Sequence, residues 1–106
     1  MEIIKTAVFK VKPDSLNRAQ EAIRRFVKAV DENEPETLLY LSLQAAKDET
    51  SFIHFMRFAS EDAEEFHKST EWVVKFARTI YPLCVEEPRF HLYRAVACAS
   101  PKEGQV

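Results

Sequence analysis

The fold is decided by one segment, Ser51-Phe-Ile-His-Phe-Met-Arg-Phe-Ala-Ser-Glu-Asp-Ala-Glu-Glu-Phe-His-Lys-Ser69. Its periodicity changes halfway along, and the surrounding architecture follows from that change. Its first half alternates as a β-strand does, with one side carrying His54, Met56 and Phe58 and the other carrying Ile53, Phe55 and Arg57. Its second half begins a helix, because Ser60 can cap it and acidic residues follow where the helix dipole favours them. A strand leading directly into a helix is expected to bring His67 towards His54, Met56 and Phe58.

The remaining elements follow from the same two periodicities. Alternation predicts strands at residues 3–12, 37–46 and 89–97, and a polar turn at residues 47–50 makes the third strand return antiparallel. Apolar residues from Leu16 to Val30 keep three- and four-residue spacing, which predicts an amphipathic helix of about four turns, capped by Asp14 or Ser15 and ended by residues 31–35. The helix after Ser60 should break and restart near residues 68–71 before continuing to residue 80.

The order β-α-β-β-α-β predicts an α+β, ferredoxin-like fold: a four-stranded antiparallel sheet with helices on one face. The strands are apolar in both registers, as in Val8 beside Phe9 and Tyr40 beside Leu41, whereas a sheet with one wet face should alternate cleanly. We therefore expect a homodimer through the open sheet face, a dimeric α/β barrel. A monomer with an apolar surface is the alternative.

Length and composition set the outer limits. The chain has 106 residues, 46% hydrophobic and 30% charged, which predicts one domain over residues 1–99 with a flexible tail at 100–106. No apolar run approaches the roughly 20 residues of a membrane span, and the first residues lack the layout of a secretory signal, so a cytoplasmic location is expected.

A net charge of -2 with both signs interspersed argues against a nucleic-acid partner. Cys84 and Cys98 fit no zinc or redox spacing.

Several short motifs resemble the antibiotic biosynthesis monooxygenase (ABM) domain, a family of the dimeric α/β-barrel superfamily. They are the run from Phe52 to Ser69 with its His67-x-Ser69 segment, Glu34-Pro35 followed by Leu39-Tyr40, and Pro82-Leu83. The resemblance covers roughly residues 3 to 97.

The chain also differs from the family pattern. Glu36 stands where the family often has Gly, and Met56 and Phe58 stand where it often has Glu and Trp. The heme-degrading branch uses an Asn in the first strand, where this chain has Thr6. These differences argue against heme degradation.

The resemblance implies a cofactor-independent monooxygenase, without metal or flavin, acting with O2 on a small aromatic, phenolic or quinol-like substrate. Such chemistry needs a base to remove a phenol proton and an apolar pocket to shield the electron-rich anion; histidine and aromatic side chains suit these tasks. His67 is the candidate base. The candidate substrate-binding residues are His54, Met56, Phe58, Tyr40 and Trp72. Two histidines without a carboxylate at ligand spacing are too few for a metal site.

Each of these residues also has a structural interpretation. His67 could be hydrogen-bonded in the core, His54 and Tyr40 could simply pack, and Trp72 could anchor the core or a dimer edge. A non-catalytic module that binds a small hydrophobic ligand, or heme, is therefore the alternative function.

Overall fold

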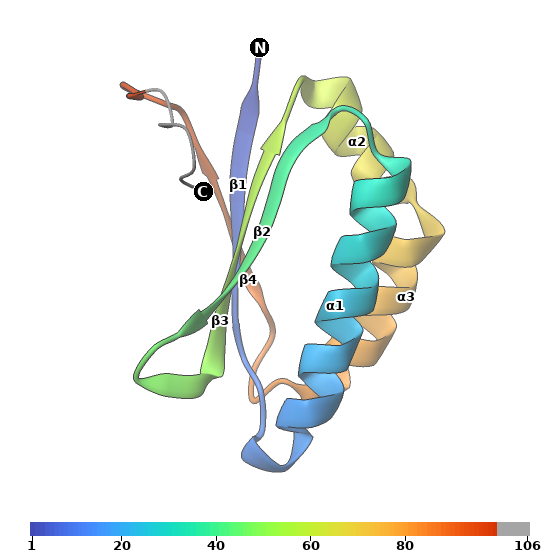
Figure 1. Ribbon diagram of the computed structural model, residues 1–106, viewed down its shortest axis with the longest axis vertical. Helices are drawn as coiled ribbons and strands as arrows, with labels where there is room; N and C mark the ends of the chain where they lie inside the picture. Colours follow the sequence, from blue (N-terminus) through green and yellow to red (C-terminus); the bar gives the residue numbers. More distant parts are fainter. Residues whose placement is uncertain (100–106) are drawn as a thin grey trace.

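The computed structural model describes residues 1–99 and confirms the predicted fold class. Four strands, β1 (Ile3–Lys10), β2 (Thr37–Ala45), β3 (Asp48–Phe58) and β4 (Arg89–Tyr93), form one antiparallel sheet in the order β2-β3-β1-β4. The helices α1 (Leu16–Asn33), α2 (Glu61–Ser69) and α3 (Glu71–Ile80) all lie on one side of that sheet (Figure 1). Short 3-10 turns at Pro13–Ser15 and Tyr81–Leu83 join helices to strands. The predicted tail, residues 100–106, lies outside the described residues.

The alternation inferred for β3 is the one observed. Phe52, His54, Met56 and Phe58 are buried beneath the helices, whereas Ile53 on the other face is 44% exposed. Ala7 and Phe9 of β1 face the same way as His54, and the core gathers around these rows together with Ile23 of α1 and Ile80 of α3. The apolar stripe of each helix therefore meets the inward-facing row of the sheet, as their two periodicities require.

Several boundaries differ from those expected. Helix α1 runs to Asn33, so it has five turns rather than four; residues 31–33 continue the helix, and Glu34, the residue before Pro35, leaves helical geometry. Neither predicted cap makes a capping hydrogen bond, because the Ser15 hydroxyl donates to Asp14 instead. β3 begins already at Asp48, so the hairpin turn is shorter than the predicted polar turn, and β4 ends at Tyr93.

The predicted break between the second and third helices is confirmed. Thr70 lies between α2 and α3 in an extended conformation, and its hydroxyl accepts from the backbone N–H of Val73 while donating to the carbonyl of His67. One side chain thus ends α2 and begins α3.

The sheet face opposite the helices is largely apolar and is not covered by any of the described residues. We call it the open face; strand register places on it Ile4, Val8, Leu39, Leu41, Leu43, Ile53, Phe55 and Tyr93. Leu43 is 47% exposed and Tyr93 53% exposed. Among the described helices, none is long and apolar enough to cross a membrane.

Candidate functional site

A cavity of about 340 Å³ lies between the sheet and the helices, which is within the usual size of a small-molecule site. Its sheet side is formed by Lys5, Ala7, Phe9, Tyr40, His54, Met56 and Phe90, and its helix side by Phe26, His67, Lys68, Val73, Phe76, Ala77 and Ile80, with Tyr81 and Pro88 beside them. Most of this wall is apolar, and no Asp or Glu from residues 1–99 lines it.

Small side chains on the sheet leave room for the cavity. His54 in β3 has Ala7 as its neighbour on β1 and Ser42 as its neighbour on β2. A larger residue at either position would project towards the same space, because residues paired across antiparallel strands share a face. The imidazole of His54 therefore stands between two short neighbours.

The pair of His67 and Glu34 is the most specific polar feature beside the cavity. His67 comes from the last turn of α2, and Glu34 directly follows α1. Nδ1 of His67 lies 2.8 Å from Oε1 and 3.0 Å from Oε2 of Glu34. The side chain of Glu34 is 1% exposed and that of His67 is 8% exposed, so the pair is sheltered from water.

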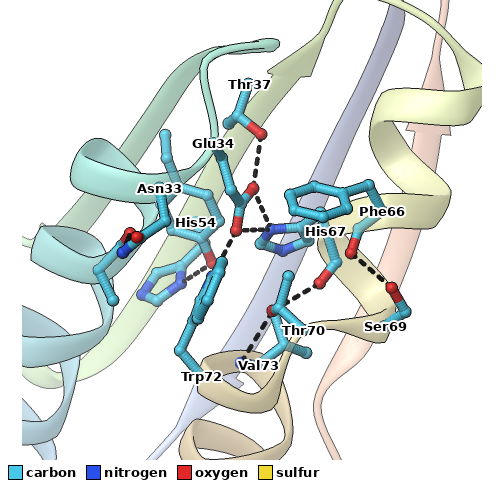
Figure 2. Close-up of polar contacts among 12 residues, drawn as sticks. Asn33, Glu34, Thr37, His54, Phe66, His67, Ser69, Thr70, Trp72 and Val73 are labelled. Atoms are coloured by element: carbon cyan, nitrogen blue, oxygen red, sulfur yellow. Dashed lines mark hydrogen bonds and ion pairs between the residues drawn. The ribbon is translucent and has the colours of Figure 1, made fainter.

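Two further donors hold the Glu34 carboxylate in place (Figure 2). The Thr37 hydroxyl donates to Oε1 at 2.6 Å and the Trp72 indole N–H donates to Oε2 at 2.5 Å. Burial by itself would raise the pKa of Glu34, but the hydrogen bonds from His67, Thr37 and Trp72 outweigh it and hold this pKa below its usual value. Glu34 is therefore ionised at neutral pH.

An ionised carboxylate can only accept, so it fixes the tautomer of His67. Nδ1 must carry the proton that is donated to Glu34, and among residues 1–99 no hydrogen bond involves Nε2. A neutral imidazole in this tautomer has a free lone pair on Nε2. This is the geometry of a histidine oriented by a carboxylate to accept a proton.

His54 forms a second polar pair, with Tyr40. The Tyr40 hydroxyl lies 2.7 Å from Nδ1 of His54. Burial lowers the pKa of His54 to about 4, so this imidazole is neutral at pH 7. Burial, and then the charge of Glu34, raise the pKa of Tyr40 well above its usual value, so its hydroxyl stays protonated. The Tyr40 ring stands between the two histidines, with centroids 5.3 Å from His54 and 5.7 Å from His67.

The sequence-based candidates fall into two groups. His67, His54, Met56 and Tyr40 line the cavity together. Phe58 does not line it; it is fully buried with its ring centroid 5.1 Å from that of His67. Trp72 also lies outside the cavity wall, where its indole anchors Glu34.

Glu34, Phe26 and Phe76 are the site residues that the sequence did not reveal. Glu34 belongs to an acidic run that has the composition of a solvated helix end, although the following Pro35 marks it as the place where α1 must stop. Phe26 and Phe76 follow the apolar spacing of their helices, and their rings stack 4.3 Å apart beside the cavity. Only the packing of α1 against α3 shows that they form a wall.

The described residues form no metal site beside the cavity. Within residues 1–99, no three His, Cys, Asp or Glu side chains are grouped so that they could hold a metal ion. Lys5 lies at the edge of the cavity, where it pairs with Glu64 at 3.0 Å and lies over the ring of Phe90.

Comparison with known proteins gives a consistent result. The profile of the antibiotic biosynthesis monooxygenase family matches residues 2–79. Among solved structures, proteins assigned to these monooxygenases are similar: one from Nitrosomonas europaea (21% identity, TM-score 0.83, 90% of each chain covered) and one from Caulobacter crescentus (23% identity, TM-score 0.84, 91% of each chain covered). One from Deinococcus radiodurans shares 14% identity at a TM-score of 0.81, covering 94% of this chain and 98% of its own. These structural likenesses establish the shared fold. No significant match was found among curated proteins.

Proposed function

Since this chain belongs to the antibiotic biosynthesis monooxygenase family, we propose that it is a cofactor-independent monooxygenase for a small aromatic, phenolic or quinol-like substrate. The observation that carries the proposal is the buried pair of Glu34 and His67, whose histidine lines a mainly apolar cavity. His67 is the proposed general base, and Glu34 is the residue that positions it.

The first step is a proton transfer within the cavity. The substrate hydroxyl gives its proton to Nε2 of His67, and Glu34 stabilises the imidazolium that forms through its hydrogen bond with Nδ1. The resulting phenolate is electron-rich, and its charge is unshielded by water because the surrounding side chains are mainly apolar. Tyr40 and Met56 are proposed to contact the substrate, since both face the same space.

The second step is the reaction of this anion with O2. For a hydroquinone, one oxygen atom forms a new C–O bond on the ring and the other leaves as water, giving a hydroxyquinone. The substrate supplies all four electrons that O2 takes up, so the balanced reaction needs no other reductant. The role of the protein is to generate the anion in a dry site and to hold it there.

The open face supports the further proposal that the chain forms a homodimer. Its exposed leucine, isoleucine and tyrosine side chains form a larger apolar surface than a monomer usually leaves in water. A second copy is the proposed partner on this face, which leaves the cavity on the helix side of each sheet.

Oxygen uptake with a hydroquinone tests the proposed reaction. The variant His67→Ala should slow turnover at least about tenfold, because the base is lost. Glu34→Gln should also slow it, because an uncharged amide no longer requires the proton to sit on Nδ1. Glu36→Gln is the matched control, since Glu36 is exposed two residues away and should leave the rate unchanged.

Isotope labelling separates this reaction from simple autoxidation. With 18O2, one labelled atom should appear in the ring of the product, and buffer without protein gives the background. Wild-type protein with no uptake above background, or His67→Ala with full turnover, would contradict the assignment.

A further inference from the structure

One buried polar atom of the cavity-lining residue His54 has no partner among the described residues. His54 is 1% exposed, and its Nε2 makes no hydrogen bond with any of the residues 1–99. Its ring belongs to the cavity lining and is packed edge-on against Phe9, with centroids 5.0 Å apart. A buried polar group without a partner is unfavourable, so this nitrogen calls for a partner that residues 1–99 do not supply.

The hydrogen bond with Tyr40 determines whether Nε2 of His54 is a donor or an acceptor. If Nδ1 of His54 donated to the Tyr40 oxygen, the phenolic hydrogen would have no acceptor among the described residues and Nε2 would be an unpaired acceptor. If Tyr40 donates to Nδ1, only one group remains unpaired, namely the Nε2–H donor. The second arrangement leaves fewer buried groups unsatisfied, so Nε2 carries a hydrogen.

The surroundings restrict the partner further. Ala7, the neighbour of His54 on β1, is short and lines the cavity, so a ligand can approach over it. Phe76 lies on the helix side, with its ring centroid 5.8 Å from that of His54 and the two planes nearly parallel. This space suits a flat ring with an acceptor atom at its edge, and a cation would meet no carboxylate on the wall described above.

We propose that the Nε2–H of His54 is a docking point for a hydrogen-bond-accepting oxygen, a carbonyl or a phenolic oxygen, on a flat uncharged or anionic ligand. The proposal rests on the proposed function in that it uses the same cavity, but it requires no reaction. Together with His67 it defines a substrate class: a ring that has one ionisable hydroxyl for His67 and a second oxygen for His54. His54 is then a specificity-determining residue, and Tyr40 is the residue that positions its tautomer.

The test compares two probes that differ in one oxygen atom. Isothermal titration calorimetry with 1-tetralone and with tetralin measures what the carbonyl contributes, because the two bicyclic rings have almost the same shape. Wild-type protein should bind 1-tetralone about fivefold more tightly than tetralin, the usual net effect of one hydrogen bond. Equal affinities, or no binding of either probe, would overturn the proposal.

Two variants assign the difference to His54 and to this cavity. In His54→Phe the preference for 1-tetralone should disappear while tetralin still binds. In Ala7→Leu both probes should bind much more weakly, because the added methyl groups fill the space beside His54. A preference that persists in His54→Phe would contradict the docking role.

A measurement on the wild-type protein covers the possibility that His54→Phe fails to fold. Long-range 1H–15N spectra report which imidazole nitrogen carries the hydrogen. They should show a protonated Nε2 in His54, with a resonance that moves on addition of 1-tetralone and stays in place with tetralin. A hydrogen on Nδ1 would overturn the proposal.

These outcomes are separable from those of the oxygenase test. A carbonyl preference that depends on His54, without oxygen uptake, would remove the oxygenase and leave the docking point. Oxygen uptake that depends on His67, without a carbonyl preference, would support the oxygenase and remove the docking point.

Discussion

At the scale of single residues, the site consists of two histidines with opposite hydrogen-bonding roles. His67 has its proton held at Nδ1 by the Glu34 carboxylate, which leaves Nε2 as an acceptor. His54 receives the Tyr40 hydrogen at Nδ1, which leaves Nε2 as a donor. The tautomer of His67 is set by a carboxylate that can only accept, whereas that of His54 follows from leaving the fewest buried groups unpaired, since the protonated Tyr40 phenol can donate or accept.

The burial of His54 should appear in the acid stability of the protein. Its pKa is lowered to about 4 in the folded chain, against about 6.5 for the unperturbed group. Between these values the unfolded chain takes up a proton that the folded chain does not, so stability is fully present above pH 6.5 and falls as the pH drops towards 4. The loss attributable to His54 is on the order of 3 kcal/mol.

Urea unfolding of wild type and His54→Gln at several pH values measures this effect. Glutamine does not titrate, so the variant should lose less stability than wild type between pH 6.5 and 4, when each is compared with its own value at pH 7.5. Identical slopes in the two proteins would show that His54 is protonated equally in the folded and unfolded chains.

At the scale of elements, the break between α2 and α3 orders the site. Thr70 joins the carbonyl of His67 to the first turn of α3. His67, the proposed base, therefore lies at the end of one helix, while Trp72, which anchors Glu34, lies at the beginning of the next. A single continuous helix would space these side chains differently along one axis.

Replacing Thr70 by Ala should lower the free energy of unfolding by about 1 kcal/mol, because the hydroxyl that caps α3 is lost. Thr70→Ser keeps a hydroxyl and is the matched control. Urea denaturation followed by circular dichroism gives both values. An unchanged midpoint in Thr70→Ala, or an equal loss in Thr70→Ser, would mean that the hydroxyl does not support the break.

At the scale of the whole molecule, the two faces of the sheet have different tasks. One face carries the helices (Figure 1), the core and the cavity, whereas no element of residues 1–99 covers the largely apolar open face. Pairing two open faces would bury an area on the order of 2,000 Å², which is typical of stable dimers. Residues such as Leu43 and Ile53 would then lie between two sheets rather than in water.

Sedimentation velocity at micromolar concentration should find wild-type dimers. Ile53→Glu should give monomers, because a carboxylate would be buried unpaired at the centre of the interface. Val74→Glu is the matched control: Val74 is exposed to a similar degree on α3, and its replacement should leave the dimer intact. Wild-type protein that sediments as single chains would contradict this role of the open face.

The element order, the sidedness of each strand and the break near Thr70 could be predicted from the sequence. These features depend on spacings of two, three and four residues and on one capping hydroxyl, which act within a few residues. Where such local signals conflict, the prediction was wrong: the polar residues 31–33 lengthen α1 rather than ending it.

The residues of the candidate site could be predicted only in part from the sequence. His67, His54, Met56 and Tyr40 could be selected because they follow from the inward faces of β2, β3 and α2. Phe58 shares that inward face with His54, yet it lies under His67 instead of on the cavity wall, since sidedness does not specify depth along the strand.

The sequence by itself therefore determined the ferredoxin-like order of elements and the side of the sheet on which histidines gather. Only the tertiary structure decided that Glu34 is buried, that it pairs with His67 33 residues away, and that the short side chain of Ala7 lines a cavity beside His54. The reason is physical: periodicity and caps are local, whereas a buried ion pair and a cavity exist only once the ends of α1 and α2 are packed over the sheet.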